Sequence, residues 1–400
     1  MGNRKVTKLV SFWSAFILAL FLGTVAEAAG VCRIGKKEYS SLELAVVSAK
    51  SGQKITMLKA YKSDREIQIV GKKLVIDFNH KKYTSKGTDT PLFRILPGAS
   101  LTVRNMNISS EEASFHVNGK LTIESGTYKG GTIFVENAGN IKITGGTFKA
   151  YKNQALIYQS ETSRGKVVIT GGTFQGSLDQ SLFHSKGGRF NIHGGTFKAK
   201  GSSVLSNWGN VSIRGGEFHS EKWEGNIIAS WGKLEISGGK FVSKGDISSI
   251  LYATEESQTR ILGGDFYGLG TSLSLWGKGT ISQGTFYGDE VLIEKSGKVQ
   301  VEGGDFRGSI LVKGEAEFRA GKSSGSIYAW DGGKVTIHDF TVELPASKKE
   351  SCLINKQGTF LVKGGSFTAQ SGFGYEGDVR FDTKDIASLF HVKRLQEWED

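Results

Sequence analysis

The chain has 400 residues, with 55 glycines but only 3 prolines, and a formal net charge of +12 at pH 7. Abundant glycine without proline argues against a collagen-like or disordered chain and favours many tight turns. The lysines are scattered and form no dense basic block, so we expect no nucleic-acid partner and favour acidic polysaccharide or a cell-wall or matrix polymer.

The first 28 residues predict an export signal rather than part of the fold. Three basic residues come first, an uncharged apolar run covers residues 9–25, and Ala26-Glu27-Ala28 places small residues at a cleavage site. The alternative is an uncleaved membrane anchor, for which the run is at the short end. We expect cleavage, no integral membrane segment afterwards, and a secreted or cell-surface protein.

Residues 29–60 are expected to cap the N-terminal end of the fold. Over residues 40–52 a serine start, apolar residues spaced by two to four and a glycine stop predict an amphipathic helix. Strands are predicted around it, at Ile55 to Leu58, Ile67 to Val70 and Leu74 to Phe78.

A Gly-Gly-x-Phe motif recurs through the chain and indicates a repeat architecture. It occupies residues 145–148, 171–174, 194–197, 215–218, 238–241, 263–266, 303–306 and 364–367, with degenerate copies between. From Phe148 to Phe306 the successive Phe positions, including the degenerate copy, lie 20 to 26 residues apart. This spacing is one coil of a β-solenoid, whereas a β-propeller blade needs about 40–45 residues.

Each repeat has the same predicted local structure. A short strand such as Val167 to Ile169 comes first, with its first and third residues pointing inward. The glycine pair turns the chain, and the Phe points inward and stacks on its copies in neighbouring coils. A second apolar segment follows. Because one repeat cannot bury its own apolar face, we predict a parallel β-helix over residues 61–380 with roughly 11–12 coils.

Residues 381–400 are expected to form a C-terminal cap. Five apolar residues between Ile386 and Leu395 have near-helical spacing, which predicts a helix from 384 to 398. The only cysteines, Cys32 and Cys352, then lie at opposite ends of the rod. A disulfide needs Cα atoms within about 7 Å, so we predict two unpaired thiols.

The N-terminal segment resembles the opening of many bacterial secreted β-helix proteins. It has the order Ile34-Gly35-x-x-x-Tyr39-x-x-Leu42-x-x-Ala45-Val46-x-x-Ala49-x-x-Gly52-x-x-Ile55-x-x-Leu58-Lys59, followed by Ile76-Asp77-Phe78-Asn79. With the Gly-Gly-Thr-Phe coils, it is similar to the pectin-lyase-like superfamily. The resemblance implies an all-β, right-handed parallel β-helix. It implies no single function, because that superfamily includes pectate lyases, polygalacturonases, other polysaccharide lyases, phage depolymerases and non-catalytic surface proteins.

Catalytic signatures of those enzymes are missing, since the chain has no Asp-Asp, Asn-Thr-Asp or Gly-His-Gly sequence. A weaker catalytic candidate is the group His193, Arg214, Glu217 and Lys240, which should converge on three adjacent coils. A lyase needs a base and a group that neutralises the uronate carboxylate, and these residue types supply both. The favoured alternative is a structural ladder in which Glu217, Lys240 and Asp265 alternate in sign on neighbouring strands.

Four tryptophans share one position, at the end of the second apolar segment of their coils: Trp208, Trp231, Trp276 and Trp330. Lys186 and Lys313 hold that position in other coils. If the indoles face outward, they form an aromatic ladder suited to sugar rings, and the lysines suit acidic groups. The alternative is that each indole packs over its own turn and the next coil.

No metal site or cofactor is predicted. The chain has 7 histidines, none in a recognised ligand spacing. Calcium at Asp265 and Asp305 is conceivable, but two coils, about 10 Å, separate them, which is too far for one ion. The leading hypothesis is a non-catalytic polysaccharide-binding, matrix-binding or adhesion protein. The alternative is a polysaccharide lyase or depolymerase that acts on an acidic glycan.

Overall fold

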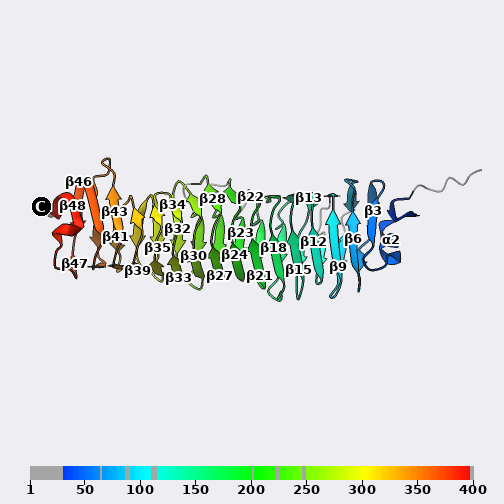
Figure 1. Ribbon diagram of the computed structural model, residues 1–400, viewed down its shortest axis with the longest axis horizontal. Coiled ribbons are helices and arrows are strands. Elements are labelled where there is room, and N and C mark those ends of the chain that lie inside the picture. The colour runs from blue at the N-terminus through cyan, green and yellow to red at the C-terminus, as the bar shows by residue number, and fades with distance from the viewer. Residues whose placement is uncertain are drawn as a thin grey trace, which may run out of the picture.

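The computed structural model describes residues 30–63, 65–85, 91–109, 115–200, 202–221, 225–245 and 249–396. The predicted export signal lies outside these residues. The described chain forms a parallel β-solenoid of about 15 turns, which confirms the predicted all-β class and repeat architecture. Figure 1 shows the strands crossing a straight rod whose colours run in chain order from one end to the other. Within this part of the chain, no helix is long and apolar enough to span a membrane.

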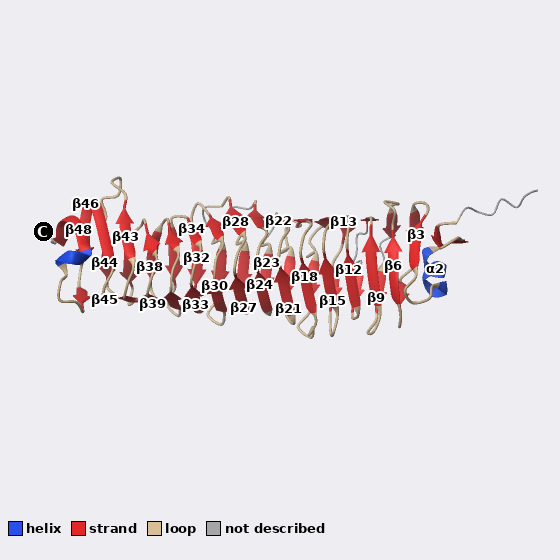
Figure 2. Ribbon diagram, in the orientation of Figure 1, coloured by secondary structure: helices blue, strands red, loops and turns tan. Residues whose placement is uncertain are grey.

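Each full turn contributes one strand to each of three parallel ladders. Figure 2 shows that strands and the loops between them make up the rod, with short helices only near its two ends. The first ladder comprises β3 (Lys54–Met57), β6 (Lys73–Asp77), β9 (Ser100–Arg104), β12 (Lys120–Ile123), β15 (Asn140–Ile143), β18 (Lys166–Ile169), β21 (Arg189–Ile192), β24 (Asn210–Ile213), β27 (Lys233–Ile236), β30 (Gln258–Ile261), β33 (Lys278–Ile281), β36 (Lys298–Val301), β39 (Glu315–Phe318), β42 (Lys334–Ile337), β45 (Thr359–Val362) and β47 (Val379–Phe381).

The second ladder follows the glycine pairs. It comprises β4 (Tyr61–Ser63), β7 (Tyr83–Ser85), β10 (Met106–Ser109), β13 (Gly126–Gly130), β16 (Thr147–Ala150), β19 (Thr173–Gln175), β22 (Thr196–Ala199), β25 (Glu217–Ser220), β28 (Lys240–Ser243), β31 (Asp265–Tyr267), β34 (Thr285–Tyr287), β37 (Asp305–Phe306), β40 (Lys322–Ser323), β43 (Thr341–Leu344), β46 (Ser366–Glu376) and β48 (Phe390–Gln396).

The third ladder holds the second apolar segment of each coil. It comprises β5 (Ile67–Ile69), β8 (Phe93–Ile95), β11 (Phe115–Val117), β14 (Ile133–Val135), β17 (Ile157–Gln159), β20 (Phe183–Ser185), β23 (Leu205–Asn207), β26 (Ile228–Ser230), β29 (Leu251–Ala253), β32 (Thr271–Leu275), β35 (Glu290–Ile293), β38 (Ser309–Val312), β41 (Ile327–Trp330) and β44 (Leu353–Lys356). The long strand β46 pairs with both β43 and β44 and so joins the second and third ladders.

The core of the rod is built by alternation along each strand. In β18 the first and third residues of the predicted Val167 to Ile169 strand are fully buried, as expected. The Phe residues of the second ladder form a buried column from Phe148 to Phe306. Successive rings there are stacked, with centroids 4.7 to 5.1 Å apart. The predicted inward stacking is therefore confirmed.

The glycine pair is required at the corner between the first and second ladders. Gly172 has a φ of +110°, a conformation that residues with a side chain rarely adopt. A Cβ on Gly171 would lie 2.8 Å from the carbonyl oxygen of Thr144 in the preceding coil. The corner thus needs positive φ at one glycine and close backbone approach at the other.

At the N-terminal end, helix α2 (Leu42–Ser48) forms within the predicted range but is shorter. The Ser41 hydroxyl accepts a hydrogen bond from the Leu44 N–H at 3.1 Å and caps the helix. Two short strands, β1 (Cys32–Ile34) and β2 (Lys37–Tyr39), pair antiparallel, and β1 also pairs antiparallel with β3. This hairpin covers the outer edge of β3 and ends the first ladder there.

The C-terminal helix prediction is wrong for the described residues. Only one turn of 3₁₀ helix forms, η1 (Ala387–Leu389), and the chain then enters strand β48 beside β46. Phe390 stacks on Phe367 at 5.0 Å, in the same register as the aromatic column but separated from it by Ser323 and Val342. The open edge of β46 offers backbone hydrogen bonds that an isolated helix would leave unused, and Phe390 and Val392 fit a two-residue period as well as a helical one.

The number of coils is also larger than predicted. Parallel pairing already begins at β3, ahead of the first Gly-Gly-x-Phe motif. In these early coils the inward second-ladder positions hold Tyr83 and Ile108 rather than Phe. The motif therefore marks only part of the solenoid.

The prediction of two unpaired thiols is confirmed, since Cys32 and Cys352 are both free and buried. Cys32 lies in β1 and Cys352 lies just before β44, near the opposite end of the rod. Burial raises the pKa of each thiol to about 12.

Candidate carbohydrate-binding site

The four predicted tryptophans share one position on the rod. Each comes directly after one of the aligned third-ladder residues Asn207, Ser230, Leu275 and Ala329. The backbone N–H of Trp208 donates to the backbone carbonyl of Ser185 in the preceding coil, at 2.7 Å. The backbone N–H of Trp231 donates in the same way to Asn207, also at 2.7 Å. The same register places Trp276 after β32 and Trp330 at the end of β41. Lys186 and Lys313 occupy it after β20 and β38, as the sequence predicted.

Only two of these tryptophans come together. Trp208 and Trp231 stack with centroids 4.5 Å apart and planes 5° from parallel. Trp208 keeps 39% of its surface exposed, and Trp231 is half-buried. Each indole therefore packs on the neighbouring coil and also contributes to the surface. Because the two rings cover each other's facing sides, solvent reaches this pair chiefly at the ring edges.

Trp276 and Trp330 lie apart from this pair. Thr254 holds the shared position between Trp231 and Trp276, and Glu294 and Lys313 hold it between Trp276 and Trp330. The Lys313 ammonium is 3.5 Å from the Glu294 carboxylate, so it is already paired. Trp330 is 46% exposed but stacks on no other ring in the described part of the chain.

Sequence reasoning missed four further rings that extend the Trp208–Trp231 pair along the rod. We call the whole set the aromatic stripe: His116, Phe134, Tyr158, His184, Trp208 and Trp231. Its successive centroids lie 4.5 to 5.9 Å apart. The first four are the outward middle residues of β11, β14, β17 and β20. In β23 and β26 that residue is small, Ser206 or Ala229, and the tryptophan after the strand continues the stack.

A groove of about 460 Å³ runs beside the aromatic stripe. One side is formed by stripe residues Phe134, Tyr158, His184 and Trp208, together with Lys186. The other side is formed by residues that precede the third-ladder strands: Thr132, Asn153, Gln154, Ala155 and Gln180. The mixture of apolar ring surface and a few polar groups is typical of ligand sites of this size.

Lys186 supplies the cationic group of this groove. Its ammonium lies 5.6 Å from the Tyr158 ring centroid and 5.4 Å from the Trp208 ring centroid, so it contacts both rings by cation–π interaction. It also lies 3.3 Å from the exposed Glu161 carboxylate. The hydrogen bonds that its ammonium donates to Tyr158 and to Glu161 raise the pKa of Lys186, which keeps it charged.

Two buried atoms of groove-lining residues, His184 Nδ1 and Gln154 Oε1, have no hydrogen-bond partner among the described residues. Buried polar atoms normally have one, so these positions have unused hydrogen-bonding capacity. Burial, and then the Lys186 ammonium, lower the pKa of His184 below its ordinary 6.5. His184 is therefore neutral at neutral pH, with one nitrogen donor and one acceptor.

The turn that carries Trp208 is fixed from inside the rod by Asn207. The fully buried Asn207 amide donates to the Ser230 hydroxyl and to the Lys233 carbonyl, both at 3.0 Å. These bonds tie the turn to the next coil, where Trp231 is found. Asn207 is thus a positioning residue for the exposed end of the aromatic stripe.

The structure places His193, Arg214, Glu217 and Lys240 on three adjacent coils, as the sequence indicated. No hydrogen bond or ion pair joins these four residues to one another among the described residues. Burial, then Arg214 and Lys166, lower the pKa of His193.

The remaining members of this group contact other residues. Glu217 lies 3.7 Å from the ring of His219, and the Lys240 ammonium lies 5.4 Å from the Tyr267 ring centroid. The predicted alternation of Glu217, Lys240 and Asp265 holds in the strand register, but no ion pair within 4 Å is formed along it.

In the described part of the chain, no cluster of three or more His, Cys, Asp or Glu residues is arranged to hold a metal ion. Of the two aspartates considered for calcium, Asp305 has the Lys322 ammonium 3.6 Å away and also pairs with Arg307. Comparison of the chain with protein-family models, with curated proteins and with solved structures found no match.

Proposed function

We propose that this protein is a secreted or cell-surface β-solenoid that binds polysaccharide at the aromatic stripe and acts as a binding or adhesion protein. The observation that carries the proposal is the row of six neighbouring rings, all stacked except the tilted Tyr158–His184 pair, with Lys186 between Tyr158 and Trp208, beside a groove. Sugar rings combine apolar C–H surface with hydroxyl groups. The exposed edges of the stripe rings offer both complements, as apolar ring carbons and as hydrogen-bonding atoms.

The shape of the site favours a polymer over a small ligand. The five steps between its six coils, at about 4.8 Å each, give the stripe a length of roughly 24 Å. Contacts that are individually weak add along one chain, because the second and later contacts form at high effective concentration. The formal net charge of +12 favours a glycan that carries some acidic groups, although Lys186 itself already pairs with Glu161.

The export signal and the resemblance to the pectin-lyase-like superfamily support the same proposal. If the signal is cleaved as the sequence predicts, mass spectrometry of the exported protein will show a chain that begins at Ala29. A chain retained in the membrane with its N-terminus intact would contradict the proposed localisation.

The binding function is tested by affinity electrophoresis through gels that contain neutral or acidic polysaccharides. We expect retardation of the wild type by at least one polymer, and at least about tenfold weaker binding by Trp208→Ala, which is about 1.4 kcal/mol. Trp330→Ala is the matched control, because Trp330 shares the position and exposure of Trp208 but lies outside the stripe. Equal retardation of all three proteins by every polymer that retards the wild type would contradict the proposal. Release of unsaturated products would instead support the lyase alternative.

A further inference from the structure

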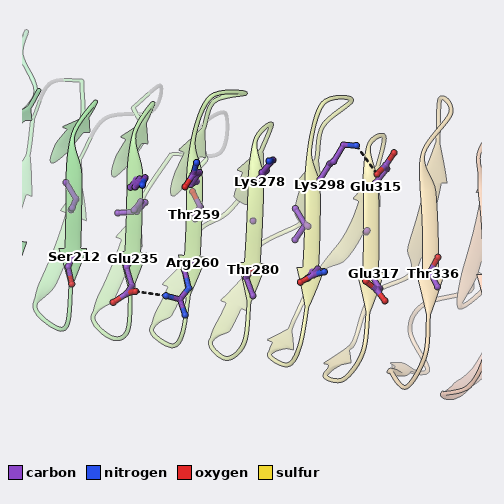
Figure 3. Close-up of a pocket in the computed structure, with 18 of the residues that line it drawn as sticks. Ser212, Glu235, Thr259, Arg260, Lys278, Thr280, Lys298, Glu315, Glu317 and Thr336 are labelled. Carbon is purple, nitrogen blue, oxygen red and sulfur yellow. Dashed lines mark hydrogen bonds and ion pairs between the residues drawn. The ribbon is translucent and has the colours of Figure 1, made fainter. Parts of the chain in front are cut away.

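A second groove, of about 1190 Å³, runs along the first ladder and shares no residue with the aromatic stripe. Its lining residues come from nine consecutive strands, from β21 to β45, so its length is eight steps of about 4.8 Å, or roughly 38 Å. Figure 3 shows two rows of outward side chains, with Lys278, Lys298 and Glu315 in one row and Thr280 and Glu317 in the other. Between the rows the residues point inward, so backbone forms the floor.

The first-ladder groove is basic. Seven lysines and arginines line it, against three glutamates: Arg189, Lys233, Arg260, Lys278, Lys298, Lys334 and Lys363, against Glu235, Glu315 and Glu317. This leaves a formal excess of four positive charges. A concave surface of one sign attracts oppositely charged ligands more strongly than isolated surface charges do.

All three glutamates are already paired. Glu235 is 3.1 Å from Arg260, and Glu315 lies between Lys298 at 3.3 Å and Lys334 at 3.4 Å. Glu317 is paired with Arg319 and with His338. The negative charge in the groove is therefore neutralised locally, and the excess positive charge resides on the lining cations that form no ion pair.

Besides Lys363, which follows β45, three cations in the groove form no ion pair among the described residues: Arg189, Lys233 and Lys278. They are the first residues of β21, β27 and β33, which are alternate strands of the first ladder. Two coils separate each from the next, so the three charges repeat at about 10 Å along the rod. The pairing of strands fixes this interval.

Apart from Leu361, the other outward side chains of the groove are neutral and hydrogen-bonding: Asn191, Asn210, Ser212, Gln258, Thr280, Gln300 and Thr336. The only lining ring is the imidazole of His338, which is paired with Glu317 at 2.9 Å. Single-stranded nucleic acids are bound largely by stacking of bases on aromatic side chains, and this groove lacks such rings. Amides, hydroxyls and spaced cations instead suit sugar hydroxyls and carboxylates.

We propose that the first-ladder groove is a separate binding site for an extended anionic polysaccharide, a polyuronate in chemical class, lying parallel to the rod axis. Its carboxylates pair with Arg189, Lys233 and Lys278, and its hydroxyls bond to the neutral side chains between them. A polyuronate carries a carboxylate on every sugar, so alternate carboxylates along the polymer can meet these cations. The groove does not depend on the aromatic stripe, because the two sites use different ladders.

The test measures binding of polygalacturonate to the full chain at low and high salt, by affinity electrophoresis and by titration calorimetry. For the double variant Lys233→Gln/Lys278→Gln we expect at least about tenfold weaker binding at low salt and a weaker dependence on salt. The control, Lys149→Gln/Lys198→Gln, removes the same charge from outward positions of the second ladder and should bind as the wild type does. Circular dichroism checks that both variants remain folded.

Two further measurements distinguish binding in this groove from binding at the aromatic stripe and from unspecific attraction of any polyanion. Trp208→Ala should keep its affinity for polygalacturonate in the groove, whatever happens to glycan binding at the stripe. Equal losses in the groove variant and in the second-ladder control would overturn the proposal. Duplex DNA that binds as tightly as polygalacturonate, and is weakened equally by the groove variant, would overturn it as well, because the groove would then recognise any polyanion.

Discussion

The most demanding prediction about the scaffold concerns Phe218, which lies in the middle of the buried aromatic column. Phe218 is fully buried and stacks on Phe197 and on Phe241, in each case with centroids 4.7 Å apart. Replacing a buried Phe by Ala costs about 3–5 kcal/mol. The backbone hydrogen bonds of β22, β25 and β28 hold both neighbouring rings in register, so the cavity cannot close. We therefore expect Phe218→Ala to lower the free energy of unfolding by about 4–5 kcal/mol, near the upper end of this range.

A second substitution separates ring stacking from apolar volume. Phe218→Leu keeps most of the buried volume but loses two ring pairs, each worth about 0.5–1.5 kcal/mol. We therefore expect a loss of about 1–3 kcal/mol. His219→Ala is the control, because His219 lies next in β25 but points outward, and its loss should stay within about 0.5 kcal/mol.

Native-state hydrogen exchange is the suitable assay, because coils of a solenoid interact mainly with their neighbours and unfolding need not be two-state. The free energy of opening should fall most in the coils that contain β22, β25 and β28. A loss below about 1 kcal/mol for Phe218→Ala, or an equal loss along the whole rod, would refute the reasoning.

Three further predictions concern the turns, the thiols and pH. Gly239→Ala should destabilise by roughly 1–3 kcal/mol in denaturant unfolding, because φ is +117° and the added Cβ would lie 3.3 Å from the Phe241 ring; an unchanged midpoint would contradict this. Thiol reagents should leave Cys32 and Cys352 unmodified in the native protein and modify both in denaturant, because burial raises each pKa to about 12; rapid native labelling would contradict it. Because the pKa of His184 is lowered in the folded protein, the unfolded chain binds this proton at a higher pH than the folded chain does. The free energy of unfolding should therefore fall as pH drops below about 6.5. His184→Phe should reduce that fall, as followed by thermal unfolding.

The scaffold was predictable because its constraints repeat. Gly-Gly-x-Phe recurs at one-coil intervals, and each copy imposes the same corner and the same inward ring, as at Gly172 and Phe174. The C-terminal helix was predicted wrongly because Phe390 and Val392 fit helical and strand periods alike. The strand forms because the free edge of β46 pairs with it, and that edge is evident only once the preceding coil is folded.

The candidate sites were less predictable because they are made by residues that share a register but not a chemistry. His116, Phe134, Tyr158 and His184 lie in three-residue strands, and no motif joins them before the coils are aligned. The first-ladder groove is similar. Whether Lys233 has a partner depends on Glu235 in its own strand and on Arg260 in the next coil, which pair with each other.

The most direct test of glycan binding at the aromatic stripe is a tryptophan emission titration with a soluble oligosaccharide of the polymer that retards the protein. Because Trp208 is partly exposed and lines the groove, saturation should change the emission and reduce acrylamide quenching in the wild type. The same change should persist in Trp330→Phe and disappear in Trp208→Phe. A ligand-induced change that survives in Trp208→Phe at undiminished amplitude would contradict binding at the stripe.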